Sequence, residues 1–116
     1  MVILIVESWY PPDKASDAGK KWLEVTQKFP PDRKIEKRLM VAVESTEDGI
    51  HTIGAWDIKE GKEKEALLRM SNAMLMFTTI EGYRYSIKTY LSAVEAMGII
   101  GLKAPEDVPE KAPEIY

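Results

Sequence analysis

The chain has 116 residues, of which 45% are hydrophobic, and this length and composition suit one folded domain with a single core. Its 16 basic and 19 acidic residues are mixed along the sequence and give a formal net charge of -3, so no basic stripe can follow a phosphate backbone and we expect no nucleic-acid partner. Because the chain has no cysteine, disulfides, thiolate metal sites and cysteine nucleophiles are excluded.

The chain opens on an apolar run rich in β-branched residues, Val2 to Val6, which predicts a strand that Pro11-Pro12 stops. Both faces of this run are apolar, as in the central strand of a sheet. It is far shorter than the roughly 18 residues of a membrane helix, and no basic segment precedes it, so we expect a cytoplasmic protein without membrane contact. Apolar residues then recur at helical spacing from Ala15 to Phe29 and predict a helix that Pro30-Pro31 ends.

Two strand-like runs follow, Ile35 to Glu44 and Ile50 to Ile58, and the Asp48-Gly49 turn between them predicts a hairpin. Gly54 lies inside the second run, where a glycine predicts a bulge, a close backbone approach or packing against a large side chain. Helical spacing from Ala66 to Phe77 predicts a second helix. The alternation from Tyr83 to Leu91 then predicts a fourth strand.

The C-terminal part of the sequence has little apolar periodicity. Ser92 and Glu95 match a capping box, which predicts a short third helix that ends near Gly98. Beyond Leu102, prolines at 105, 109 and 113 stand among alternating charges. We therefore divide the chain into one domain, residues 1–102, and a proline-rich extended tail, residues 103–116, that forms either an arm or a frayed end.

Strand, helix, strand occurs twice in this order of elements. Right-handed connections place both helices on one face, so we predict an α+β, ferredoxin-like βαββαβ fold with a four-stranded antiparallel sheet and a short C-terminal helix. The strand order would be four, one, three, two, with the first strand central. The opposite face would expose Ile3, Ile5 and Trp9 or their alternates, so we expect a second copy of the chain to cover it in a homodimer.

This pattern resembles the dimeric α/β-barrel superfamily, which includes antibiotic-biosynthesis-type monooxygenases and muconolactone isomerases. The resemblance lies in the element order over residues 1 to about 100, the apolar first strand and the hairpin at Asp48-Gly49. It implies a homodimer with a cavity between sheet and helices or between the two sheets. It carries no catalytic motif, so no functional residue transfers to this chain.

Strand alternation sorts the side chains of the later strands into two sets. The predicted core set is Leu39, Val41, Val43, Ile50, Trp56, Ile58, Tyr83, Tyr85, Ile87 and Leu91. The opposite set is Glu36, Arg38, Met40, Ala42, Glu44, His51, Ile53, Ala55, Asp57, Arg84, Ser86, Lys88 and Tyr90, joined by Glu7 and Trp9 if the first strand faces that way. Such a mixed face is either a polar interface or the wall of a pocket for an anionic or aromatic ligand.

His51 is the only histidine and therefore the first candidate for a general acid or base, with Glu7 as a second proton carrier. The alternative is an exposed or structurally bonded histidine at the start of a strand. One histidine without carboxylates at ligand spacing makes no metal site, so we predict neither a metal nor a cofactor.

Aromatic and basic side chains supply the candidate ligand contacts, because rings offer large contact areas and basic groups bind anions. The predicted ligand-binding set is Trp9, Arg38, Trp56, Arg84, Tyr85, Lys88 and Tyr90. Core packing or a dimer interface is the alternative role for the aromatic members.

Three functions remain open from the sequence. The first is a non-catalytic dimeric module that binds a small molecule or a partner. The second is a cofactor-free enzyme of the monooxygenase or isomerase kind, acting on an aromatic or enolizable substrate. The third is a structural or assembly role in which the tail from Lys103 to Tyr116 wraps a neighbouring subunit.

Overall fold

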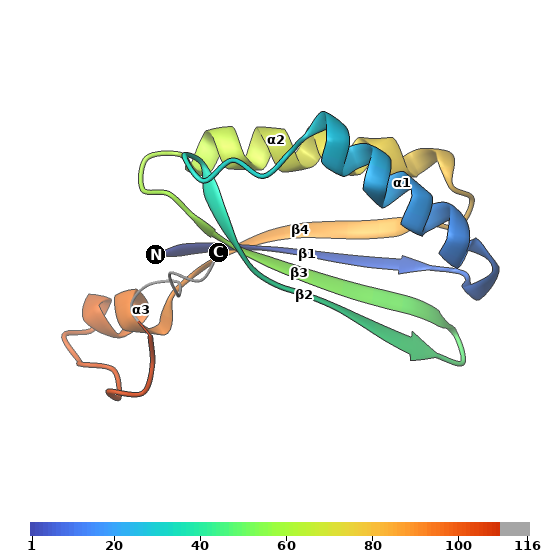
Figure 1. The fold of residues 1–116 in the computed structure, drawn as a ribbon. Coiled ribbons are helices and arrows are strands. Elements are labelled where there is room, and N and C mark those ends of the chain that lie inside the picture. Colours follow the sequence, from blue (N-terminus) through green and yellow to red (C-terminus); the bar gives the residue numbers. More distant parts are fainter. Residues whose placement is uncertain (110–116) are drawn as a thin grey trace.

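The fold was determined as a computed structural model, which describes residues 1–109 (Figure 1). Its elements are β1 (Val2–Tyr10), α1 (Ala15–Lys28), β2 (Glu36–Thr46), β3 (Gly49–Ile58), α2 (Glu63–Leu75), β4 (Arg84–Leu91) and α3 (Ala93–Ile99). Two short 3-10 turns, Pro12–Lys14 and Met76–Thr79, precede α1 and extend α2.

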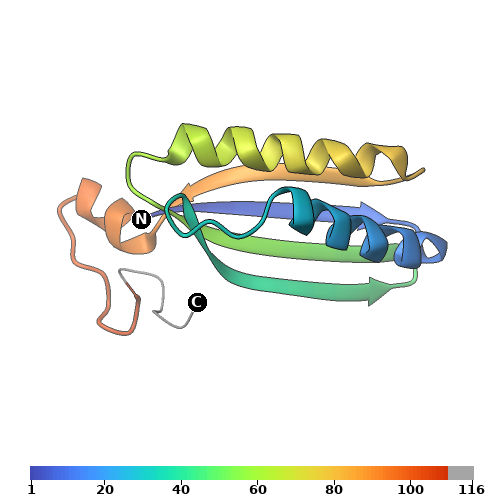
Figure 2. The same ribbon diagram turned by 45° about the horizontal axis from the view of Figure 1, so that its top comes forward.

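The four strands form one open antiparallel sheet in the order β2-β3-β1-β4. Helices α1 and α2 lie together on one face, and no element of residues 1–109 covers the other (Figures 1 and 2). The predicted ferredoxin-like α+β architecture and strand order are therefore confirmed, and β1 is central as its two apolar faces predicted.

Helix α3 follows β4 directly and lies beyond the end of the sheet (Figure 1). The side chain of Ser92 caps it, since the Ser92 hydroxyl accepts a hydrogen bond from the backbone N–H of Glu95 over 3.2 Å. The predicted short C-terminal helix is thus confirmed. Residues 103–109 contain one turn, closed by the backbone of Val108 and Pro105, and the remainder of the predicted tail, 110–116, lies outside the described residues.

The core lies between the helices and the β1–β3 region of the sheet. Leu4, in the middle of β1, is 0% exposed. It belongs to an apolar cluster that both helices and three of the strands supply: Leu4, Val6, Ala18, Val25, Ile58, Met70, Ala73, Met74 and Phe77, with Ile87 of β4 packed against it. Burial of this cluster is the main force that holds the helices on the sheet.

A tight hairpin joins β2 to β3, and Gly49 explains its position. The backbone φ of Gly49 is 142°, and a Cβ built there would lie 2.8 Å from the backbone oxygen of Tyr10. Only glycine meets both conditions, so the Asp48-Gly49 signal correctly located the turn.

One extra residue in β2 overturns part of the predicted side-chain assignment. Arg38 pairs with Trp56 and Met40 pairs with Ala55, so Leu39 is inserted between consecutive pairs as a β-bulge. Glu36 and Arg38 consequently point to the helix side of the sheet, and their predicted place on the opposite face is wrong. From Met40 onward the predicted alternation holds, because the extra residue reverses which of the odd and even positions faces the helices.

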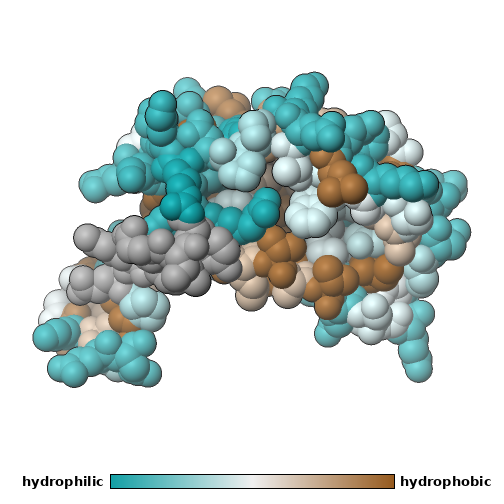
Figure 3. All heavy atoms as spheres, viewed as in Figure 1, coloured by the Kyte–Doolittle hydropathy of each residue, from teal (hydrophilic) through white to brown (hydrophobic). Residues whose placement is uncertain are grey.

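Three members of the predicted core set are on the helix side but not in the core. Val41 and Val43 are 44% and 65% exposed, because the outer half of β2 extends past the cover of the helices. Leu91 is also exposed, at the end of β4. Figure 3 shows apolar side chains gathered over the strands below the helix layer.

Candidate ligand cavity

A cavity of about 400 Å³ lies between the two helices and the β1–β3–β2 side of the sheet. Ligand pockets commonly have volumes from about 300 to 1,000 Å³, so the space suits a small molecule. Its walls are mainly apolar and aromatic: Val6, Trp22, Val25, Phe29, Trp56, Met70, Met74 and Phe77. Trp22 is 45% exposed at its edge, because the space beneath the ring is not filled by other side chains.

Small residues on facing elements leave this space open. Ala73 of α2 and Gly54 of β3 both line the cavity. The distal ring of Trp56 lies over Gly54, since a Cβ built on that glycine would be 2.6 Å from Cη2 of Trp56. Of the three roles predicted for Gly54, packing against a large side chain is the one observed, and the indole of Trp56 forms part of the floor.

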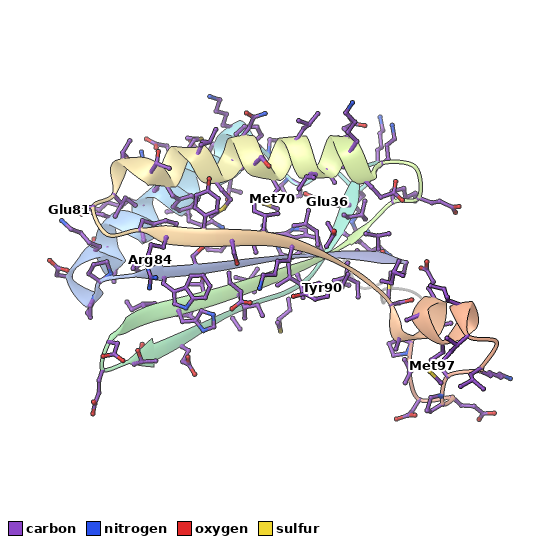
Figure 4. The ribbon with its side chains drawn as sticks, turned by 180° about the vertical axis from the view of Figure 1, so that it is seen from behind. Glu36, Met70, Glu81, Arg84, Tyr90 and Met97 are labelled. Carbon is purple, nitrogen blue, oxygen red and sulfur yellow. The ribbon has the colours of Figure 1, made fainter. Side chains whose placement is uncertain are left out.

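Charged side chains occupy one end of the cavity. The Nη1 atom of Arg69 is 4.0 Å from Oε1 of Glu36, and Nη2 of Arg69 donates to the backbone oxygen of Pro30. The guanidinium of Arg38 lies 5.9 Å from the ring centre of Trp22. Figure 4 shows Glu36 and Met70 together in the space between α2 and the sheet.

Two polar atoms at this charged end are buried without a hydrogen-bond partner among the described residues: Oε2 of Glu36 and Nε of Arg38. Buried polar atoms in folded proteins are nearly always paired, so these two atoms, like the Ser86 hydroxyl on the opposite face, require an explanation. Burial raises the pKa of the Glu36 carboxyl, while the positive charges of Arg69 and Arg38 act in the opposite direction. Glu36 is therefore a carboxyl that takes up a proton more readily than usual.

Hydroxyl groups occupy the other end. Ser8, which is 2% exposed, lies on β1 opposite Thr52 of β3, and both line the cavity with Tyr83. Burial raises the pKa of the Tyr83 hydroxyl to about 12, against the opposing effect of a hydrogen bond with Ser8. The ring of Phe77 stacks on Tyr83 with centroids 4.8 Å apart and helps to fix its orientation.

The structure divides the predicted ligand-binding residues between the two faces of the sheet. Arg38 and Trp56 line the cavity. Tyr85 is on the same side but packs against the core. The other four lie on the opposite face: Trp9, Arg84, Lys88 and Tyr90. Figure 4 shows Arg84 and Tyr90 along β4.

The two predicted proton carriers, His51 and Glu7, also lie on the opposite face, outside the cavity. Nε2 of His51 is 2.8 Å from Oε2 of Glu7, and Nδ1 is 3.3 Å from Oε1 of Glu44. The hydrogen bond to Glu7 is the main reason why the pKa of His51 is raised above its ordinary value of 6.5. Their catalytic role stays a prediction, and both side chains lie away from the cavity.

Aromatic stacking holds His51 in this arrangement across three strands. The Trp9 ring stacks on the His51 ring at 5.2 Å with an interplanar angle of 8°, and the Arg84 guanidinium lies 5.8 Å from the Trp9 ring. The strand register produces this row, because Trp9 pairs with His51 on one side and with Arg84 on the other. Within residues 1–109 no three histidine, aspartate or glutamate side chains are grouped as metal ligands.

Most cavity residues were not among the predicted site residues, and four of them carry the polar groups described above. Glu36 was assigned to the wrong face for the reason given above. Ser8 shares its face with Leu4 and Val6, and that alternation was a usable signal. Tyr83 had a signal too, because its alternation with Tyr85 and Ile87 placed it in the predicted core set. Arg69 gave no comparable signal, since it enters the cavity through the packing of α2.

Comparison with known proteins found no matching family model, no matching curated protein and no matching solved structure. The interpretation of the cavity therefore depends on its own geometry. Among the described helices, none has the length and apolar character needed to cross a lipid bilayer.

Proposed function

We propose that this protein is a homodimeric small-molecule-binding protein whose ligand occupies the cavity between the helices and the sheet. One observation carries the proposal: an apolar cavity of about 400 Å³ is lined by Glu36 and Arg38, and each of these residues has a buried polar atom that lacks a partner within the described chain. Apolar walls with a few convergent polar groups are typical of ligand pockets.

The cavity is partly open to solvent and has mainly apolar walls. A ligand that enters it therefore removes apolar surface from water, which favours binding. Each unpaired buried polar atom adds about 1 to 3 kcal/mol of desolvation cost. A ligand that fills the space and pairs with both atoms removes these costs, so its binding stabilises the folded state.

The homodimer part of the proposal depends on the uncovered face of the sheet. This face carries an apolar group, Ile3, Ile5 and Ile53 on neighbouring strands with Met40 and Tyr90 towards the edges, beside charged side chains such as Glu7 and Lys88. Apolar patches of this kind on isolated subunits usually mark an interface. A second copy packed sheet to sheet would cover it, in agreement with the resemblance to dimeric α/β barrels.

Ligand binding is tested with two tryptophan substitutions on β2. Val41 lines the cavity, whereas Val43 is two residues further along on the same side and outside the lining. In a thermal-shift screen of aromatic acids and quinones, a ligand should raise the melting temperature of the wild type and of Val43→Trp but not of Val41→Trp. If no compound raises it, or if Val41→Trp responds like the wild type, the cavity is not the binding site.

The dimer is tested by light scattering coupled to size-exclusion chromatography. Tyr90→Asp places a charge on the uncovered face, while Leu68→Asp places one on the exposed side of α2 as a matched control. We expect the wild type and Leu68→Asp to elute as dimers and Tyr90→Asp as a monomer. A wild-type monomer at micromolar concentration would overturn this part of the proposal.

A second candidate function is proton transfer on an aromatic or enolizable substrate. The environment of the Glu36 carboxyl favours it. This carboxyl is in the cavity, has one unpaired oxygen and has a raised pKa, which are properties of a general acid or base. The test is deuterium exchange at the acidic C–H of a bound compound, followed by NMR. Glu36→Gln should stop the exchange without preventing binding, and unchanged exchange would exclude this function.

A further inference from the structure

We propose that the ligand of the cavity is a flat, elongated carboxylic acid, whose carboxylate pairs with Arg38 and whose far end carries a hydroxyl group that meets Ser8 and Tyr83. This deepens the proposed function and depends on it, since it assigns a chemical class and an orientation to the ligand of the same cavity.

The charges at one end of the cavity favour an anion. Four basic residues, Arg33, Lys37, Arg38 and Arg69, and two acidic residues, Asp32 and Glu36, are among its lining residues. Arg69 already contacts Glu36 and the backbone of Pro30. Arg38 keeps a buried Nε–H without an acceptor, and a carboxylate is the group that a guanidinium pairs with most strongly.

The strand register fixes the distance between the two polar ends. Arg38 pairs with Trp56, which pairs with Leu4 of β1, whereas Thr52 pairs with Ser8. The four-residue step from Leu4 to Ser8 corresponds to about 13 Å between Cα atoms along an extended strand. The long Arg38 side chain spans part of this distance, so a ligand with a carboxylate at one end and a hydroxyl about one aromatic ring and a short linker away fits between the two ends.

The walls between the two ends favour a flat ligand. Trp22 of α1 and Trp56 of β3 line the cavity from opposite layers, and Phe29 and Phe77 contribute further rings. Aromatic side chains favour stacked or edge-to-face contact with another ring. A conjugated arene body makes such contacts and carries no polar atoms into the apolar middle of the cavity.

Glu36 is compatible with an anionic ligand. Burial raises its pKa, and Asp32 adds to the effect, while Arg69 and Arg38 oppose it. A ligand carboxylate beside Glu36 further favours the protonated carboxyl, which then donates a hydrogen bond to the ligand. Binding should therefore take up a proton, and Glu36→Gln should bind the acid at least as tightly as the wild type.

The test uses calorimetric titration with three probes: trans-4-hydroxycinnamate, its carboxamide and trans-cinnamate. The acid should bind about tenfold to a hundredfold more tightly than the carboxamide, the size of a hydrogen bond to a charged group. Loss of the ring hydroxyl should weaken binding about twofold to tenfold, the size of a neutral hydrogen bond.

Variants assign the two ends. Arg38→Gln should remove the preference for the acid over the carboxamide, and Ser8→Ala should remove the advantage of the ring hydroxyl. Arg84→Gln, on the opposite face, is the matched control and should change neither. Circular dichroism checks that each variant is folded, and Arg38→Lys, which keeps the charge without the planar fork, should show an intermediate preference.

Failure of this inference differs from failure of the proposed function. If acid and carboxamide bind equally, and Val41→Trp blocks both, the cavity binds ligands but the assigned class is wrong. If Arg38→Gln stays folded and keeps the full preference for the acid, the assigned orientation is wrong. If none of the three probes and no other acid of the screen binds while a quinone does, the class is again overturned. If no compound of the whole screen binds, the proposed function itself is wrong.

Discussion

Replacement of Gly54 by alanine tests the packing on which the cavity floor depends. The added Cβ would lie 2.6 Å from Cη2 and 2.8 Å from Cζ3 of Trp56. Carbon atoms in contact are about 3.5 Å apart or more, so the indole has to move by about 1 Å. Because Trp56 lines the cavity, the ring has room to move away from the sheet, and Gly54→Ala should therefore both destabilise the fold and narrow the site.

The size of the effect follows from two opposing contributions. Forcing an extra methyl group into a packed site costs about 1 to 3 kcal/mol. Replacing glycine in a strand returns about 0.5 to 1 kcal/mol, because the unfolded chain loses conformational freedom. The net change is a loss of about 0.5 to 2 kcal/mol in the free energy of unfolding, which lowers the melting temperature by a few degrees for a chain of this size, at about 4 °C per kcal/mol.

Gly19→Ala is the matched control, because a Cβ at Gly19 in α1 would have no heavy atom within 4 Å of its place. This variant should gain about 1 kcal/mol in urea unfolding. Trp56→Phe removes the distal ring, so Gly54→Ala should cost little in that background and the double-mutant cycle should show a coupling of about 1 kcal/mol. Equal stability of the two alanine variants, without coupling to Trp56, would refute the reasoning.

Three further predictions concern the core, the bulge and the uncovered face. Leu4→Ala should cost about 2 to 5 kcal/mol in urea unfolding, since Leu4 is fully buried in the central strand, and a cost below 1 kcal/mol would contradict this. Deletion of Leu39 should leave the protein folded and its ligand preference unchanged, because Arg38 still pairs with Trp56 on the helix side and Met40 with Ala55 on the opposite side. A folded variant that has lost the preference would disprove the bulge assignment. Hydrogen bonding to Glu7 raises the pKa of His51, so this interaction stabilises the fold fully below pH 6.5, and its contribution is lost as the pH rises through the raised pKa. In an NMR titration of Glu7→Gln, the pKa of His51 should fall towards 6.5. An unchanged pKa would contradict the prediction.

The architecture was predictable because local and global signals agree. The β-branched run of β1, the apolar period of the two helices and the Asp48-Gly49 turn each specify one element by short-range chemistry. The order of those elements then leaves few topologies, since right-handed connections put both helices on one face. The central position of β1 followed from its sequence alone, because a run with two apolar faces is typical of an inner strand and not of an edge strand.

The candidate site was predicted only in part, and the reason is the register of β2. Alternation assigns side chains to faces only while each residue has one partner, and the insertion of Leu39 breaks this rule at a place where the sequence has no glycine to mark it. Val41 and Trp22 show a second limit, since periodicity identifies the face of an element but not how far the neighbouring layer extends over it. Arg38 and Trp56 were predicted as ligand contacts and both line the cavity, although Arg38 was expected on the other side of the sheet.

The bulge also links the fold to the proposed chemistry. If Leu39 took part in regular pairing, the alternation back from Met40 would turn Leu39 towards the helices and would turn Arg38 and Glu36 to the uncovered face. With the bulge, an arginine and a carboxyl enter an otherwise apolar cavity, where low polarity strengthens every charged contact that a ligand makes. The cost is two unpaired buried atoms in the free protein. Arg69 already lies beside Glu36, so the two unpaired atoms are what remains of this polar group for the proposed ligand to satisfy.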